Sequence, residues 1–255
     1  MKILITGASG VVGKILHLHL APWHAVTALN GRSELDLMNR QATDAYFTRH
    51  QFDVVIHCAV AGAENVLSTA PSITHTNLVM WDNLKAQSRS FDRLINMASG
   101  CELGCEPQRR EIDLTEQLPL LPYGLSKNLI ARDVLKTSGW YNLRLFGLIA
   151  QTRLFWKLQE AAVAGKTKFD IYDDKYMDYI HEDDLAKIVR TYVESKISLP
   201  NDVNMVYEKK YKVSEVVARY IDDMGFDLEL NILNTLDDTA GYTGDGSRLA
   251  QLGIL

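Results

Sequence analysis

Short apolar runs alternate with stretches of helical periodicity along the first 150 residues. Strand–helix units of this length build a parallel sheet with helices on both faces, and burial on both faces accounts for the almost continuous apolar run VVIHCAV. The fold class predicted is therefore α/β, with a doubly wound parallel sheet. The predicted strands are Lys2–Thr6, Ala25–Leu29, Asp53–Ala59, Arg93–Ala98 and Tyr141–Phe146, and the predicted helices are Val11–Leu20, Arg40–His50, Thr76–Ser90 and Tyr123–Thr137.

The regular alternation weakens after about Gly147. Two further helices are predicted near Leu154–Ala164 and Glu182–Ser195, with short β segments at KFDIYDD and VNMVY. No long linker and no repeat separates these elements from the first part. We expect a main domain over 1–150 with returns near 182–206, and a small substrate-binding lobe within 151–255 that is interleaved with the main sheet.

The stretch LITGASGVVGKIL follows the first strand and precedes the first helix. In that context Gly7 permits a tight turn, Gly10 lets the backbone approach a pyrophosphate, and Gly13 lets the helix pack close to the strand. Amide groups at the helix N-terminus then face the phosphates. Three glycines in seven residues also suit a purely structural turn, but the strand-to-helix context favours dinucleotide binding by a Rossmann domain.

Composition excludes several classes of protein. The 255 residues are 47% hydrophobic, which is typical of a packed globule, and the net charge is −5 without a basic run for nucleic acid or an anionic membrane surface. No signal-peptide core or membrane-spanning segment is present, so a cytoplasmic location is expected. Cys58, Cys101 and Cys105 are expected to be reduced thiols, and no spacing in the chain indicates a metal site.

Three polar residues carry candidate chemistry. In YGLSK, Tyr123 and Lys127 are four residues apart, which places both side chains on one helix face. An ammonium group beside a phenol lowers the phenol pKa from about 10 and suits Tyr123 to proton exchange with a hydroxyl or carbonyl group. Ser99 ends the strand RLINMAS at the sheet edge where ligands bind, although serine is also common in turns.

The order of glycine loop, strand-end Ser and Tyr-x-x-x-Lys resembles the short-chain dehydrogenase/reductases. The chain is most similar to their extended branch, the NAD-dependent epimerase/dehydratase family, which modifies nucleotide sugars. The resemblance spans nearly the whole chain and rests on several segments in the family's order. These segments are ITGASGVVG, MASGCELG, YGLSK, LRLFGL, MDYIHEDDLAKIV and YTGDGSRLAQLG.

The resemblance implies roles for individual residues. Ser99, Tyr123 and Lys127 would be catalytic: Tyr123 would exchange the proton, Ser99 would hold the substrate oxygen, and Lys127 would tune Tyr123 and bind the nicotinamide ribose. Asn77 would lie in the helix behind the active site. The remaining cofactor-binding positions would be Gly7, Gly10, Val11 and Val12 at the pyrophosphate, Asp36 and Leu37 beside adenine, and Cys58 and Ala59 beside the nicotinamide ribose.

The end of the second strand bears on the choice of cofactor. An acidic residue there would accept the ribose 2′-hydroxyl of NAD(H), whereas an arginine can pair with the 2′-phosphate of NADP(H). The chain carries Arg32 and no acid in NGR, and RSELDL resembles a segment of GDP-fucose synthases whose arginine serves NADP. NADP(H) is therefore favoured over NAD(H), with a solvated loop charge as the other interpretation of Arg32.

The function expected from the resemblance is reduction of the keto group of a nucleotide-linked deoxysugar by an NADP(H)-dependent enzyme. Gly100 and Cys101 stand where sugar dehydratases carry Asp and Glu, which disfavours dehydration. Cys101 coincides with an acid/base cysteine of GDP-fucose synthases, but a packing role is the alternative. A nucleotide-sugar epimerase that holds NAD tightly and a dinucleotide-sensing protein without catalysis remain as alternatives.

Two departures from the family pattern concern the substrate. Ala98 stands where relatives often carry a first Ser, and Met177 stands where an Arg that assists the diphosphate often precedes Asp178. Neither change affects the residues for hydride transfer.

Two further expectations concern structure. The acids that follow His181 are expected to stabilise the start of a helix. The resemblance also implies a homodimer formed by a four-helix bundle that includes the helix bearing Tyr123.

Overall fold

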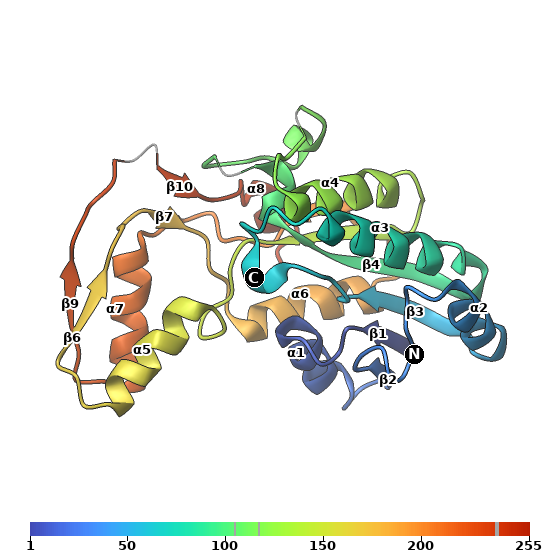
Figure 1. Ribbon diagram of the computed structural model, residues 1–255, viewed down its shortest axis with the longest axis horizontal. Helices are drawn as coiled ribbons and strands as arrows, with labels where there is room; N and C mark the ends of the chain where they lie inside the picture. Colours follow the sequence, from blue (N-terminus) through green and yellow to red (C-terminus); the bar gives the residue numbers. More distant parts are fainter. Residues whose placement is uncertain (105, 117, 238–239) are drawn as a thin grey trace.

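The main domain is built on one parallel sheet. The computed structural model describes residues 1–104, 106–116, 118–237 and 240–255. Six strands pair in the order β2-β1-β3-β4-β5-β8, and every neighbouring pair is parallel (Figure 1). The predicted doubly wound α/β fold is confirmed. The strands are β1 (Lys2–Thr6), β2 (Ala25–Leu29), β3 (Phe52–His57), β4 (Phe91–Ser99), β5 (Trp140–Leu145) and β8 (Asp202–Asn204).

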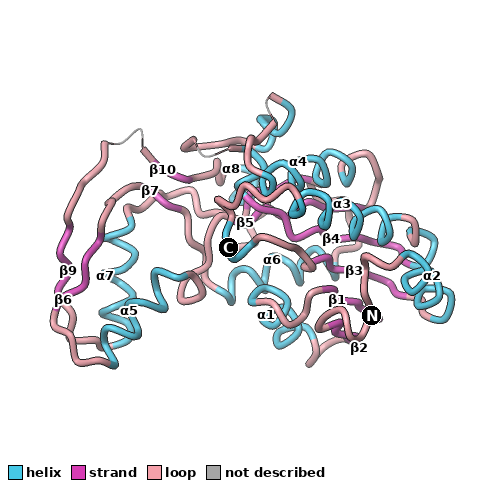
Figure 2. Tube along the Cα trace, viewed as in Figure 1, coloured by secondary structure: helices cyan, strands magenta, loops and turns pink. Residues whose placement is uncertain are grey.

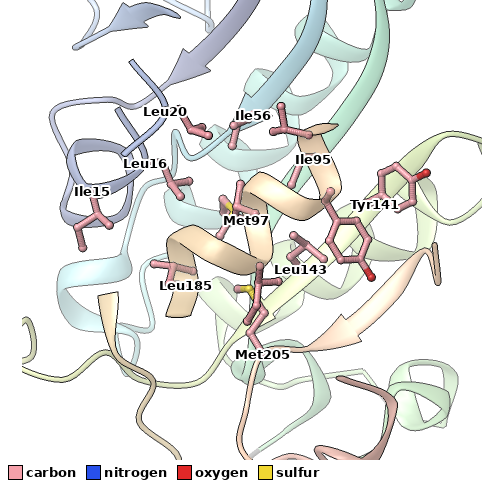
Figure 3. Close-up of a cluster of buried hydrophobic side chains, with 14 of the residues drawn as sticks. Ile15, Leu16, Leu20, Ile56, Ile95, Met97, Tyr141, Leu143, Leu185 and Met205 are labelled. Carbon is pink, nitrogen blue, oxygen red and sulfur yellow. The ribbon is translucent and has the colours of Figure 1, made fainter. Parts of the chain in front are cut away.

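Helices cover both faces of this sheet, because its strands are apolar on both sides. On one face α1 (Val11–Leu20) and α6 (Glu182–Glu194) pack against residues such as Ile56, Ile95 and Leu143 (Figure 3). The opposite face is covered by α2 (Arg40–Arg49), α3 (Ser72–Lys85) and α4 (Pro122–Val134), whose core includes Trp81 and Trp140. Figure 1 shows the two helical layers below and above the sheet.

The strand order reverses between β1 and β3. The chain passes from β1 to β2 on one side of the sheet and then crosses to β3 on the other side of β1, in register Thr6↔His57. Ligands of open α/β sheets bind in the crevice outside the carboxyl ends of strands at such a reversal. The loops that follow β1 and β3 therefore mark the expected ligand site.

A small lobe lies beside the main domain. It contains α5 (Arg153–Val163), α7 (Val213–Met224) and the parallel pair β6 (Lys168–Ile171) and β9 (Glu229–Ile232), which stand apart from the large sheet in Figure 2. Its core is separate and includes Phe155, Leu158 and Val217. A second parallel pair, β7 (Tyr176–Met177) with β10 (Gly241–Tyr242), and the terminal helix α8 (Ser247–Gln251) complete the chain.

Some elements differ from the sequence-based expectation. The third helix starts at Ser72, four residues before the predicted start at Thr76, because Pro71 stands directly before it and its fixed φ suits a helix start. Helix α7 and strands β7, β9 and β10 were not predicted. Among the described residues no helix has the length and apolar character needed to cross a membrane.

Candidate active site

The loop between β1 and α1 needs glycine at two positions. Gly7 has φ of +66°, a left-handed conformation that L-residues avoid, and a Cβ placed on it would lie 2.6 Å from Ala59 Cα. A Cβ on Gly13 would lie 2.5 Å from the Gly7 carbonyl oxygen. The first glycine therefore makes the turn, and the third allows α1 to approach the loop closely.

The N-terminus of α1 presents free amide groups at the carboxyl edge of the sheet. Helix α1 begins at Val11 with Gly10 as its N-cap, so no side chain caps it, and its first turn carries no acidic residue. The first N–H groups of a helix have no partner within the helix and attract anions. The backbone at Val11 and Val12 thus fits the pyrophosphate of a dinucleotide.

Replacing Gly13 with Ala tests this close packing. The new methyl group would meet the Gly7 carbonyl oxygen at 2.5 Å and would push α1 away from the turn. We expect a loss of about 1–3 kcal/mol in the free energy of unfolding and weaker dinucleotide binding, measured by urea unfolding and by calorimetry with NADPH. Gly31 has open space around it and no positive φ, so Gly31→Ala serves as the control for stability and should leave the free energy of unfolding unchanged.

The loop that follows β2 carries the residues predicted to contact the adenosine part of the cofactor. The Arg32 side chain is 71% exposed and its Nε lies 3.9 Å from Asp36 Oδ1, so solvent screens this pair. Asp36 accepts a hydrogen bond from the Met38 amide at 3.0 Å. Leu37 is buried, and its carbonyl oxygen accepts from Asn83 Nδ2 at 2.7 Å, which fixes the end of the loop against α3.

The loop that follows β3 lies next to the glycine turn. The Cys58 amide donates to the Thr6 carbonyl at 3.1 Å, and burial raises the pKa of the Cys58 thiol to about 12, so this cysteine stays a neutral thiol. Asn77 on α3 is buried, accepts from the Ala61 amide at 2.7 Å and donates to Ser126 Oγ at 2.9 Å. The Asn77 side chain thus links this loop to α4 and supports the site from behind.

Ser99, Tyr123 and Lys127 come together at the carboxyl end of β4. Ser99 is the last residue of β4, while Tyr123 and Lys127 lie in the first turns of α4 with their side chains buried. Helix α4 starts with Pro122 at its first position, which suits a helix start. Lys127 Nζ donates to the Met97 carbonyl of β4 at 2.8 Å, so its ammonium group is fixed at the strand end.

The ionisation of Tyr123 differs from the sequence-based prediction. Its pKa is raised above 10, because burial penalises the phenolate more than the nearby Ser99 hydroxyl stabilises it. The expected net lowering of the Tyr123 pKa is therefore not found in this structure, where burial dominates. Burial also lowers the pKa of Lys127, and the carboxylate of Glu102 partly offsets that effect.

A fully buried ionic cluster supports the loop that follows Ser99. Glu102 Oε1 accepts from Arg144 Nε at 2.5 Å and from Asn142 Nδ2 at 2.8 Å. Arg144 Nη2 also donates to Asp202 Oδ1 at 2.8 Å and its Nη1 to Asn204 Oδ1 at 2.7 Å. Because β5 and β8 supply these partners, the cluster ties the Ser99 loop to the sheet. The sequence pattern did not single out these contacts.

A second phenol reaches the site from the C-terminal segment. Tyr242 Oη donates to Cys101 Sγ at 3.3 Å, and the Cys101 amide donates to Ser99 Oγ, also at 3.3 Å. A Cβ on Gly100 would lie 2.5 Å from the Tyr242 hydroxyl, so glycine is required beneath the phenol. The resemblance pointed to YTGDGSRLAQLG as a segment but gave Tyr242 no role.

No group of His, Cys, Asp and Glu suited to a metal ion occurs within the described ranges. Cys58 and Cys101 are free thiols there, and Cys105 lies outside the described residues. The acids at the start of α6 act as the helix brace expected from their position, since Glu182, Asp183 and Asp184 fill its first turn and Asp184 accepts a hydrogen bond from Tyr207 at 2.5 Å.

Comparison with known proteins gives consistent matches. Residues 3–205 match the NAD dependent epimerase/dehydratase family. GDP-L-colitose synthase of Yersinia pseudotuberculosis is 23% identical over 88% of this chain and 83% of that protein. GDP-L-fucose synthase of Azorhizobium caulinodans is 26% identical over 90% of this chain and 84% of that protein. The dTDP-4-dehydrorhamnose reductase of Bacillus anthracis, solved with NADP, superposes with a TM-score of 0.83 at 14% identity, covering 100% of this chain and 93% of that one.

Proposed function

Because the chain belongs to the NAD dependent epimerase/dehydratase family of extended short-chain dehydrogenase/reductases, we propose that it reduces the keto group of a nucleotide-linked deoxysugar with NADPH. The observation that carries this proposal is the meeting of two groups of residues at one sheet edge. Ser99, Tyr123 and Lys127 lie at the carboxyl end of β4, and the glycine turn lies at the carboxyl end of β1. A dinucleotide on the turn would extend toward Tyr123.

The residues at β4 divide the work of carbonyl reduction. Tyr123 donates a proton to the carbonyl oxygen, and the Ser99 hydroxyl holds that oxygen at the strand end. Lys127, fixed by its bond to the Met97 carbonyl, supplies positive charge near the developing alkoxide and a donor for the nicotinamide ribose. NADPH, when bound, supplies the hydride.

Similarity to reductases favours the reductase over the epimerase, because a dTDP-4-dehydrorhamnose reductase in complex with NADP superposes on nearly the whole chain. Burial raises the pKa of the Tyr123 phenol, and a protonated phenol is the form that a proton donor needs. Ser99, Tyr123 and Lys127 are all present, and a protein that only senses a dinucleotide would not need all three.

The residues present fit a phosphorylated dinucleotide. Gly7 and the N-terminus of α1 can receive the pyrophosphate, and the exposed Arg32 follows β2, where the adenosine ribose of a Rossmann cofactor binds. Among the similar structures, the dTDP-4-dehydrorhamnose reductase is described in complex with NADP. Arg32 can form charge-assisted hydrogen bonds to a 2′-phosphate, which NAD(H) lacks.

Replacing Arg32 with Ala tests this cofactor assignment. We expect the KM for NADPH to rise about 10-fold or more, because a charge-assisted hydrogen bond to the phosphate is lost, while the KM for NADH changes little. Steady-state kinetics with both cofactors measures the difference. Arg40→Ala removes a similar exposed arginine, whose Nε lies 2.8 Å from Asp44 on α2, and should leave both values unchanged. Equal changes for NADPH and NADH would contradict the role of Arg32.

The function itself is tested by following NADPH absorbance with a panel of nucleotide 4-keto sugars. We expect stoichiometric NADPH consumption with at least one member of the panel. Conversion of a nucleotide sugar to its epimer without net NADPH consumption would identify an epimerase instead. Dinucleotide binding without turnover of any nucleotide sugar would favour a sensing role.

The expected homodimer remains a prediction. Helices α3 and α4 lie side by side on one face of the sheet, as a four-helix bundle with two helices from each subunit requires (Figure 1). Measurement of the molar mass in solution by light scattering tests this expectation.

A further inference from the structure

The C-terminal segment brings Tyr242 to the residues proposed to bind the keto group. Its hydroxyl donates to Cys101 Sγ at 3.3 Å, and both Tyr242 and Tyr123 interact with the Ser99 hydroxyl. Tyr242 and Cys101 are partly exposed, whereas Tyr123 is buried. Two phenols therefore approach the Ser99 hydroxyl, one from α4 and one from the C-terminal segment.

Tyr242 is held in place by contacts that need no substrate. Strand β10 pairs with β7, and the Asp178 amide donates to the Tyr242 carbonyl at 3.2 Å. The Asp178 carboxylate accepts from the Gly244 amide and from Lys210 Nζ, each at 2.8 Å. The Tyr242 ring packs on Phe146 with centroids 5.1 Å apart. A donor fixed in this way loses little entropy when it binds a ligand.

The partner of the Tyr242 hydroxyl is a weak one. A thiol sulfur accepts hydrogen bonds poorly, so an oxygen atom would be a better acceptor for this phenol. Tyr242 lies outside α4, and burial raises its pKa, as it does for Tyr123, with a further contribution from Cys101. A phenol in this state donates a hydrogen bond and keeps its proton.

We propose that Tyr242 is a specificity-determining residue that donates a hydrogen bond to the sugar hydroxyl on C3, the carbon next to the keto group. The inference rests on the proposed function and takes the substrate as a 4-keto sugar, whose C4 keto oxygen Ser99 and Tyr123 hold. Oxygens on neighbouring ring carbons lie about one hydrogen-bond length apart, so an oxygen beside the keto group falls within reach of the donor that shares Ser99. In a 4-keto-6-deoxy sugar the C5 neighbour carries no hydroxyl, which leaves the C3 hydroxyl as the acceptor.

The test uses two nucleotide 4-keto-6-deoxy sugars that differ only in carrying or lacking the C3 hydroxyl. For Tyr242→Phe we expect the KM of the 3-hydroxy sugar to rise about 3- to 10-fold, with kcat within about twofold of the wild-type value. The KM of the 3-deoxy sugar should stay unchanged, because it makes no bond to the phenol. A change in general packing would affect both substrates alike.

Tyr46→Phe serves as the matched control. Tyr46 lies on α2, where its ring stacks on His50 with centroids 4.3 Å apart, and its loss of a hydroxyl should change neither KM. Equal KM changes for the two sugars, or no change for either, would overturn the role of Tyr242 while leaving the reductase intact. If the wild-type chain reduces neither of these sugars nor any other nucleotide 4-keto sugar, the proposed function fails and the inference fails with it.

Discussion

Tyr123→Phe is expected to lower kcat about 10²- to 10⁴-fold, the contribution typical of a positioned proton donor. The substitution removes one oxygen atom and leaves the ring, which is buried in the first turn of α4. Without the phenol, the keto oxygen loses the proton donor assigned to it as the hydride arrives. The quantity to measure is kcat for NADPH oxidation with an accepted nucleotide keto sugar, together with the KM for NADPH, which should change little.

Tyr172→Phe is the matched control for Tyr123→Phe. The Tyr172 side chain is exposed and lies just after β6 in the small lobe, so the loss of its hydroxyl should not affect the chemical step. If Tyr123→Phe retained near-normal turnover, another group would have to donate the proton, and the assignment of Tyr123 would be wrong.

Arg144→Leu is expected to lower the free energy of unfolding by about 3–5 kcal/mol, because it leaves buried carboxylates without their cation. Arg144 is fully buried and is the guanidinium that joins Glu102 to Asp202. One oxygen of Glu102, Oε2, already has no hydrogen-bond partner among the described protein atoms, and without Arg144 only the neutral Asn142 amide donates to the other oxygen. Urea unfolding measures the change.

The pH dependence of Arg144→Leu separates loss of charge from loss of packing. Burial raises the pKa of Glu102 even in the wild-type chain, and removal of Arg144 raises it further. A folded carboxyl whose pKa exceeds the unfolded value of about 4.3 holds more protons than in the unfolded chain, so its contribution to stability falls as pH rises through that window. The variant should therefore be less destabilised at pH 5.5 than at pH 7.5.

Two controls complete this test. Arg40→Ala removes an exposed guanidinium that pairs with the exposed Asp44 at 2.8 Å, and an exposed pair contributes about 0–1 kcal/mol. Adding Glu102→Gln to Arg144→Leu removes one unpaired charge and should recover part of the lost stability. A destabilisation that neither acid pH nor the added substitution relieves would mean that packing alone explains the effect.

Local sequence was enough to predict the main elements and the glycine turn. Alternation of apolar and polar residues fixes whether a segment can bury one face or two, and it predicted β1, β4 and α1 closely. Gly7 and Gly13 were predictable because a positive φ at Gly7 and the contact of Gly13 with the Gly7 carbonyl are local constraints, whereas the approach of Ala59 to Gly7 is not. Tyr123 and Lys127 were found by a spacing of four, which depends only on helix geometry.

Contacts between distant segments required the folded chain. Tyr242 meets Cys101 across 141 residues, and Arg144 meets Glu102 across 42 residues, so no local pattern indicates either pair. The direction of the pKa shift of Tyr123 depends on how many atoms surround the phenol, which the spacing to Lys127 does not reveal. The sequence by itself determined the strand–helix order of the first 150 residues and the candidate catalytic residues, because these follow from local periodicity and helix geometry. Only the tertiary structure decided which polar groups are buried, the direction of the Tyr123 pKa shift and the position of Tyr242 at the site, because these depend on which remote segments pack together.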